Sequence, residues 1–150
     1  MFPSRKVSPL ILSHDDRCPC GTGEIFGACC GRFHHAFAEG SGIAAPTPEA
    51  LMRSRFTAFA TGNEPYLLAT WHPSTRPSSL KLDPTLRWYR LDILATSGGV
   101  FDSTGTVEFA AHYRSQPGTP EDKRVRGVQR ENSRFERVNG EWMYVDGEVL

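Results

Sequence analysis

The sequence has no excess of charge of either sign and no long apolar run. Seventeen Lys and Arg residues balance seventeen Asp and Glu residues, so the formal net charge at pH 7 is zero. Such a balance gives no general attraction to nucleic acid or to an acidic membrane surface. No stretch reaches the roughly 18 apolar residues of a membrane span, and residues 1–16 lack the apolar core of a signal peptide. We therefore expect a cytoplasmic protein without a membrane span or a nucleic-acid partner.

Cysteine is absent from the chain except in one short segment. All four cysteines lie in RCPCGTGEIFGACCG, residues 17–31, as Cys18-x-Cys20, eight further residues, and Cys29-Cys30. Structural disulfides are rare in the cytoplasm, and adjacent cysteines seldom bridge each other. Four thiolates suit one tetrahedral Zn²⁺ ion, and such a set leaves no coordination position open for catalysis. The segment therefore predicts one structural zinc ion bound by these four cysteines.

Two alternatives for this segment stay open. The thiols could be four reduced structural cysteines, although free cysteines are usually scattered through a core rather than paired by spacing. His34 and His35 are substitute ligands, but four thiols already suffice, so both are expected at the surface. Arg17 and Arg32 flank the segment and would offset the negative charge of a four-thiolate zinc site.

Composition divides the chain into four parts. Residues 1–16 show no periodic pattern and are expected to form a flexible N-terminus, and residues 17–35 contain the cysteine segment. Residues 36–46, which include EGSGIAAP, are typical of a linker. Residues 47–150 then form the main domain.

Two helices are predicted at the start of that domain. In residues 47–63, Thr47 can cap the N-terminus, Pro48 suits the first helical position, and Gly62 can end the helix. Its apolar face carries Met52, Phe56 and Phe59. A second short helix is expected over residues 64–71.

The remaining sequence favours strands. Strict alternation in residues 106–115 places Val107, Phe109, Ala111 and Tyr113 on one face. Further strands are predicted over residues 86–97, 124–138 and 141–147. Gly127 could introduce a bulge, and Asn139-Gly140 is a strong signal for a two-residue hairpin. The order of helices followed by an antiparallel meander indicates an α+β domain.

Specific motifs in these segments resemble a known family. CPCGTGEIFGACCG resembles the SEC-C motif, named for the zinc-binding C-terminus of the SecA translocation ATPase: Cys-x-Cys, eight residues, then Cys-Cys or Cys-His, with Gly after the second Cys. Residues 51–77 and 131–147 (LMRSRFTAFATGNEPYLLATWHPSTRP and ENSRFERVNGEWMYVDG) are similar to the YchJ-like family of largely uncharacterised bacterial proteins. Some members carry a second, C-terminal SEC-C motif. This sequence has none, so no role that requires two zinc modules is expected.

The resemblance implies a fold and a metal but no reaction. The middle domain of that family has the nuclear transport factor 2-like (cystatin-like) fold, a cone of helices on a curved antiparallel sheet. Here a small N-terminal zinc knuckle would precede it. Cone-shaped relatives often dimerise through the exposed sheet face, so a homodimer is one expectation. Since the family has no agreed activity and a fold does not fix a function, the residues themselves must indicate one.

Four residues are candidates for a polar pocket inside the cone: Arg55, His72, Glu131 and Ser133. They could bind or turn over a small anionic molecule. Alternatively, Arg55 and Glu131 form a structural ion pair and Ser133 caps a backbone group, because buried charges also occur in structural networks. No nucleophile–base–orienter set is visible in the sequence, so the ion-pair alternative is favoured. His112, opposite the apolar face of its strand, is expected to be exposed.

The predicted strand over residues 124–138 carries a row of arginines on its other face, namely Arg124, Arg126, Arg130 and Arg134. A basic strip can meet a phosphate backbone. A solvated strand face is the favoured interpretation, because the chain is neutral overall and no aromatic residue is interleaved on that face.

Three functional hypotheses follow. The first is a protein-interaction module that docks on a protein partner through the zinc motif, with Arg32 and Phe33 beside the knuckle as variants that should spare folding. The second is a small-molecule-binding or enzymatic cone with its pocket around Arg55 and Glu131. The third, disfavoured, is a nucleic-acid binder. The interaction module is preferred because of the resemblance to the SecA motif. Whether the knuckle packs on the cone or moves on its linker is left open.

Overall fold

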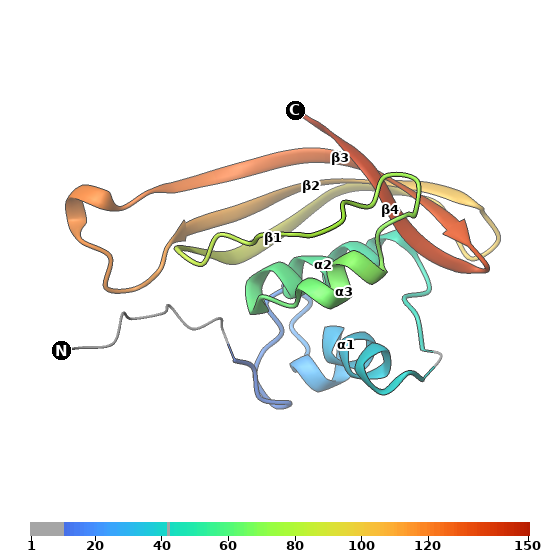
Figure 1. The fold of residues 1–150 in the computed structure, drawn as a ribbon, viewed down its shortest axis with the longest axis horizontal. Coiled ribbons are helices and arrows are strands. Elements are labelled where there is room, and N and C mark those ends of the chain that lie inside the picture. Colours follow the sequence, from blue (N-terminus) through green and yellow to red (C-terminus); the bar gives the residue numbers. More distant parts are fainter. Residues whose placement is uncertain (1–10, 42) are drawn as a thin grey trace.

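The computed structural model describes residues 11–41 and 43–150. Figure 1 shows a curved sheet arched over a layer of helices, with residues 11–41 on the far side of that layer from the sheet. Four antiparallel strands make up the sheet, in the order β1-β2-β3-β4. The strands are β1 (Leu86–Ser97), β2 (Thr104–Ser115), β3 (Arg126–Val138) and β4 (Glu141–Val149). The α+β class and the meander are therefore confirmed.

The helix α2 (Pro48–Thr61) forms with the ends that the sequence predicts. The hydroxyl of Thr47 accepts a hydrogen bond from the amide of Ala50 at 3.1 Å, which satisfies one of the free amides of the first turn. Gly62 ends the helix in the left-handed region at φ 72°, where a glycine carries no steric cost. Its buried face is directed toward the sheet and supplies much of the core.

The second helix, α3 (Glu64–Ala69), is shorter than the prediction of residues 64–71. The chain leaves the helix at Thr70 because it pairs with the edge of the sheet. The amide of Tyr144 donates to the carbonyl of Thr70 at 2.8 Å, and the amide of His72 donates to the carbonyl of Tyr144 at 2.7 Å. Trp71 and Tyr144 thus form an isolated parallel bridge, which ties the segment after α3 to β4.

The core lies between α2 and the concave face of the sheet. Alternation in β2 buries Val107, Phe109 and Ala111, as predicted. Leu51, Met52 and Phe56 from α2 pack in the same cluster as these residues, together with Phe135 and Trp142. Burial of these apolar side chains is the main driving force for the two layers to associate.

The bulge predicted at Gly127 is wrong. Gly127 pairs in regular register with Tyr113, and the shifts in register lie elsewhere, in β1 and between Arg134 and Phe135. A Cβ atom at residue 127 would collide with the phenol ring of Tyr113. The glycine therefore makes room for a cross-strand aromatic ring.

The hairpin prediction is confirmed, since Asn139 and Gly140 have φ angles of 52° and 84°, as a type I′ turn requires.

The cysteine segment packs against the rest of the fold. Its helix α1 (Cys30–Glu39) includes residues 36–39, which the sequence analysis placed in the linker. Residues 1–10 and 42, parts of the predicted flexible N-terminus and linker, lie outside the described residues. Residues 13–16 are tied to the segment, because the amide of Phe26 donates to the carbonyl of Asp16 at 2.7 Å. The division at residues 16, 35 and 46 stays a prediction.

Candidate functional site

The four cysteine side chains converge on one point. Their sulfur atoms all lie within 4.8 Å of one another, and all four residues are buried. The sulfurs of Cys20 and Cys29 are 3.5 Å apart, far more than the roughly 2.05 Å of a disulfide bond. In a tetrahedron with Zn–S bonds of about 2.3 Å, sulfur atoms lie roughly 3.8 Å apart. The cluster therefore has the donor set and the spacing of a four-coordinate metal site.

Local sequence explains how the thiols meet. Gly21 and Gly23 have φ angles of 86° and 90°, in the left-handed region that glycine adopts without strain. The chain reverses there, so the amide of Cys18 donates to the carbonyl of Glu24 at 2.9 Å. Gly31 then lets α1 begin close to the preceding turn, because a Cβ atom at residue 31 would lie only 2.6 Å from the carbonyl oxygen of Phe26.

The chemistry of the thiols also favours a cation. Hydrogen bonding to Cys18 and burial raise the pKa of Cys20 to about 11, and hydrogen bonds from the neighbouring thiols and burial raise the pKa of Cys30 as well. Hydrogen bonds from Cys20 and Cys30 lower the pKa of Cys18. One thiolate is thus favoured and further ones are costly, unless a divalent ion compensates their charge.

Hydroxyl groups lie beside the cluster. The Thr22 hydroxyl oxygen is 3.2 Å from the sulfur of Cys29, and the Thr57 hydroxyl oxygen is 3.6 Å from the sulfur of Cys18. Either hydroxyl can donate to a metal-bound thiolate, the kind of contact that orients ligands around a metal. Because Thr57 belongs to α2, the second of these contacts links the cluster to the main domain.

Two more polar contacts fix the cysteine segment on α2. A guanidinium nitrogen of Arg53 donates to the carbonyl of Cys20 at 2.7 Å. His34 places Nε2 at 2.8 Å from the carbonyl oxygen of Ser54, which can only accept, so Nε2 carries the proton. Burial lowers the pKa of His34, which keeps the ring neutral. The question left open by the sequence is answered: the knuckle packs on the main domain.

Two sequence expectations around the knuckle, and a third in β2, need correction. His34 is 6% exposed instead of lying at the surface, because its ring packs on Phe26 and Tyr66; His35 is exposed, as expected. Phe33 is also 6% exposed and belongs to the main core, so it is not a substitution site that spares folding. His112, in β2, is mostly buried instead of exposed, with 19% of its side-chain surface accessible, since its Nε2 lies 2.9 Å from the carboxylate of Asp92.

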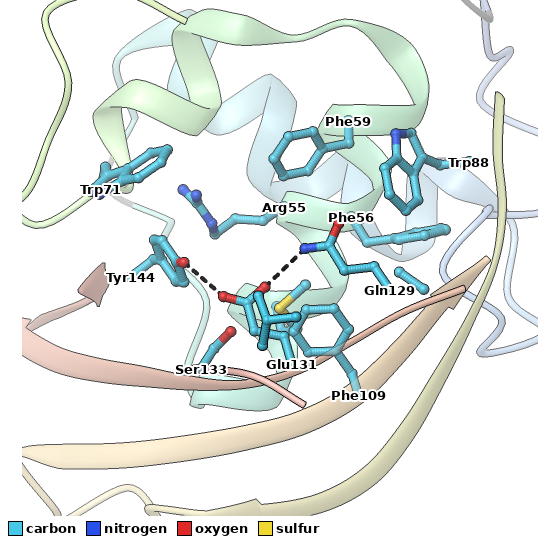
Figure 2. A pocket seen from close by; sticks show the side chains of 13 residues that line it. Arg55, Phe56, Phe59, Trp71, Trp88, Phe109, Gln129, Glu131, Ser133 and Tyr144 are labelled. Carbon is cyan, nitrogen blue, oxygen red and sulfur yellow. Dashed lines mark hydrogen bonds between the residues drawn. The ribbon is translucent and has the colours of Figure 1, made fainter. Parts of the chain in front are cut away.

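A second candidate site is a cavity of about 280 Å³ between α2 and the concave face of the sheet. Figure 2 shows that its walls come from α2, the segment after α3 and all four strands. Aromatic and aliphatic side chains dominate: Met52, Phe56, Phe59, Trp71, Trp88, Phe109, Ala111, Tyr144 and Val149. The polar members are Arg55, Gln129, Glu131 and Ser133. Apolar walls with a few convergent polar groups are typical of small-molecule sites.

Arg55 is buried in this cavity, with 2% of its surface exposed. One guanidinium nitrogen donates to the carbonyl of Leu67 and to the hydroxyl of Thr70, both at 2.7 Å. The guanidinium also lies over the rings of Trp71 and Tyr144, at 5.2 and 4.6 Å from their centroids. Burial lowers the pKa of Arg55 to about 10, so the group stays positively charged at neutral pH. Contacts with aromatic faces stabilise that charge.

Glu131 faces the same cavity but does not form an ion pair with Arg55. Its two carboxylate oxygens accept hydrogen bonds from the Tyr144 hydroxyl at 3.1 Å and from the side-chain amide of Gln129 at 3.2 Å (Figure 2). A Cβ atom at Gly147, on the neighbouring strand, would collide with this carboxylate. The carboxylate therefore depends on a glycine that no motif in the sequence indicates.

Ser133 lies beside Glu131 with its hydroxyl buried and without a hydrogen-bond partner, and the indole nitrogen of Trp71 has none either. The backbone cap that the sequence analysis considered for Ser133 is therefore not made. His72 does not line the cavity. Its Nδ1 lies 2.8 Å from the Ser74 hydroxyl, and its Nε2 lies 3.4 Å from the carboxylate of Glu136. The pairing of this segment with β4 directs the side chain of Trp71 into the cavity and that of His72 away from it.

The structure thus brings three of the four predicted pocket residues together and adds Tyr144 and Gln129. Both could have been found from the sequence by extending the period of two along their strands. Gln129 lies two residues before Glu131, and Tyr144 lies two residues after Trp142, so each pair shares one face of its strand. The roles of all these residues belong to the proposal below.

Comparisons with known proteins agree with this picture. A family model described as "YchJ, middle NTF2-like domain" matches residues 47–147. The chain is 57% identical to a UPF0225 protein of Corynebacterium glutamicum over 89% of its length and 97% of that protein, and 53% identical to one of Streptomyces coelicolor over 89% and 95%.

Solved structures show the same fold. A SEC-C motif containing protein from Rhodopseudomonas palustris superposes with a TM-score of 0.69 at 31% identity, over 89% of this chain and 98% of that one. One from Psychrobacter arcticus has the same TM-score at 23% identity, over 91% and 84%. The fold predicted for residues 47–150 is confirmed. No helix within the described residues is long and apolar enough to cross a membrane.

Proposed function

The chain belongs to the YchJ family with its NTF2-like middle domain, and on this premise we propose that it is a zinc-stabilised domain that binds a small molecule in the cavity beneath its sheet. One observation carries the proposal. The buried hydroxyl of Ser133 has no partner in a cavity that also contains the charges of Arg55 and Glu131. Leaving a buried polar group unpaired costs about 1–3 kcal/mol, a cost that a bound ligand would remove.

The zinc part of the proposal rests on the cysteine cluster. Cys18, Cys20, Cys29 and Cys30 would hold the ion, with the spacing and the all-sulfur donor set that zinc prefers. A bound ion would fix the turn and the start of α1 and leave no open coordination position. Its role would therefore be structural, namely to hold Phe33 and His34 against α2.

The lining defines the chemical class of the ligand. Aromatic walls favour a planar or ring-shaped molecule, and a volume of about 280 Å³ limits it to a few rings at most. Since one positive and one negative side chain face the cavity, a ligand without net charge suits it best. The polar end of the ligand would accept a hydrogen bond from Ser133 or Arg55 and donate one to Glu131. The lining includes no nucleophile paired with a general base, so we propose binding without assigning a reaction.

Nuclear magnetic resonance of the three tryptophan indole N–H groups tests the proposal. Trp71 and Trp88 line the cavity, whereas Trp142 donates to the carbonyl of Pro46 and lies outside it. Titration with 2-naphthol, a neutral two-ring probe, should shift the first two signals and leave the third in place. Glu131→Gln should weaken the response while the rest of the spectrum is retained. Shifts of all three signals, or of none up to the solubility limit of the probe, would contradict the proposal.

The interaction module remains a second candidate. Ile25 and Phe37, from the knuckle and α1, are 37% and 41% exposed, and exposed apolar side chains beside a rigid metal site are suited to a protein partner. Ile25→Ser should then weaken capture of a partner with little change in the melting temperature, whereas Phe37 also packs on the buried ring of Tyr66 and its exchange would cost stability. Cytoplasmic location and a homodimer stay predictions, which fractionation and the mass in solution would check.

A further inference from the structure

Three arginines stand side by side across the sheet. Arg87 of β1 pairs in register with Arg114 of β2, and Arg114 pairs with Arg126 of β3. Their neighbours Trp88 and Tyr113 lie on the concave face, where Trp88 packs against Phe59 and Tyr113. The three arginines therefore share the opposite, convex face. Like charges directly opposite each other on adjacent strands are destabilising, so this arrangement has an electrostatic cost.

No carboxylate compensates this row within the described residues. The ion pairs of the structure include neither its three members nor Arg124. Farther along the same face of β3, by contrast, Arg134 forms a bidentate pair with Asp146 at 2.6 Å, and Arg130 lies 3.9 Å from Glu108. Among the arginines on this face of β3, the uncompensated charge thus lies at one end of the sheet.

The row borders a hollow of about 470 Å³ at that end. Arg114, Arg124 and Arg126 line it together with Tyr89, the last residue of β2 and the loop that follows, residues 116–118. The guanidinium of Arg114 lies 4.6 Å from the centroid of the Tyr89 ring, and Nε of Arg124 donates to the carbonyl of Thr119 at 3.0 Å. Both side chains are therefore oriented without losing their charge. Pro117 and Val125 add an apolar wall.

We propose that this hollow binds a compact phosphorylated small molecule of the nucleoside diphosphate class, with its phosphate groups on Arg114, Arg124 and Arg126. Planar guanidinium groups match phosphate oxygens and can bind them in pairs. The volume lies in the range of small-molecule sites. The short extent of the unpaired positive charge favours a compact polyanion over a nucleic-acid strand. A strand would need the row of basic side chains to continue past Arg130 and Arg134, whose charges are already paired. The aromatic residue missing from β3 in the sequence pattern is supplied here by Tyr89 of β1.

Isothermal titration calorimetry of the zinc-loaded chain with ADP tests this proposal. ADP should bind, and raising the salt concentration should weaken it, because salt screens exposed charges. Arg126→Gln should weaken binding about tenfold, the loss expected for one charge-assisted contact to phosphate. Arg134→Gln is the matched control on the same strand and face, and it should leave the affinity of ADP unchanged within about twofold, since its partner is Asp146.

Four outcomes would overturn the proposal. They are the absence of ADP binding at low salt, adenosine binding as tightly as ADP, an equal loss in Arg126→Gln and Arg134→Gln, and an eight-residue single-stranded oligonucleotide binding far more tightly than ADP. The last result would indicate a nucleic-acid strand as the occupant. None of these measurements depends on the cavity beneath the sheet, so this site and that one can fail independently.

Discussion

The Tyr144 side chain contacts both Arg55 and Glu131. The guanidinium of Arg55 lies 4.6 Å from the centroid of the Tyr144 ring, and the hydroxyl of the same ring donates to Glu131 at 3.1 Å. A single aromatic side chain thus contacts both charges of the cavity. Each charge keeps partners of its own, and neither is neutralised by a direct ion pair. A ligand that enters the cavity would therefore meet both charges.

The contact between Glu131 and Gly147 gives the first prediction. Gly147→Ala should destabilise the fold by about 1–3 kcal/mol, since its methyl group would overlap the carboxylate of Glu131. Urea unfolding measures this cost. When Glu131→Ala is added to the same chain, most of the cost of Gly147→Ala should disappear, because the carboxylate no longer fills the space that the new methyl group needs. Glu131→Gln keeps a side chain of the same size, so the cost should remain. An equal cost of Gly147→Ala in all three backgrounds would show that the two residues are not coupled.

Zinc removal is the second prediction. Protein purified without added metal or chelator should contain one zinc ion per chain by elemental analysis and native mass spectrometry, and chelation should lower its melting temperature. Cys20→Ser should lose the ion, because it removes a fully buried ligand. His35→Ala, an exposed position in α1, is the control and should retain it. Four thiols that react freely with a thiol reagent in metal-free native protein would refute the site.

The third prediction compares two neighbours in α1. Phe33→Ala should cost about 3–5 kcal/mol, because the ring is buried in the main core. Arg32→Ala should cost about 1 kcal/mol or less, since the side chain is exposed and loses only its hydrogen bond to the carbonyl of Cys29 and its contact with the face of the Phe33 ring. Urea unfolding of the zinc-loaded variants measures both. Equal costs would mean that α1 is not part of the folding unit of the main domain.

Alkaline pH gives the fourth prediction. Burial raises the pKa of Tyr66 to about 12, whereas the unfolded value is about 10. Between these values the folded state keeps the proton that the unfolded state loses. The stability due to Tyr66 is therefore fully present below pH 10 and is lost as the pH rises through 12. Tyr144 acts in the same direction, because burial also raises its pKa.

Arg55 opposes this loss. Burial lowers its pKa to about 10, so between pH 10 and 12.5 the unfolded state binds the extra proton and the contribution of Arg55 to stability rises with pH. Two tyrosines outweigh one arginine, so urea unfolding should show a net loss of stability as the pH rises from 9.5 to 11.5. Tyr66→Phe should reduce that loss. A stability that is constant or rising over this range would contradict the assignment of buried tyrosines.

The sequence by itself determined the ends of α2, the hairpin between β3 and β4 and the four-cysteine cluster. Thr47, Pro48 and Gly62 define the ends of α2 through capping rules that act within a few residues. Asn139-Gly140 fixes its hairpin for the same reason. The thiol spacing predicted the cluster, because Cys18, Cys20, Cys29 and Cys30 are close in the chain, and the glycines between them bring them together.

Tertiary structure decided what depends on contacts between distant segments. Residues far apart in the chain meet only when strands pair, so no local pattern predicts that Tyr144 contacts both Arg55 and Glu131 or that Gly147 makes room for a carboxylate. Packing against Tyr66 and Ser54 buried His34. Strand register likewise aligned Arg87, Arg114 and Arg126, although the sequence presents them as three separate residues. Local propensity acts over a few residues, whereas register and burial are set by the whole core.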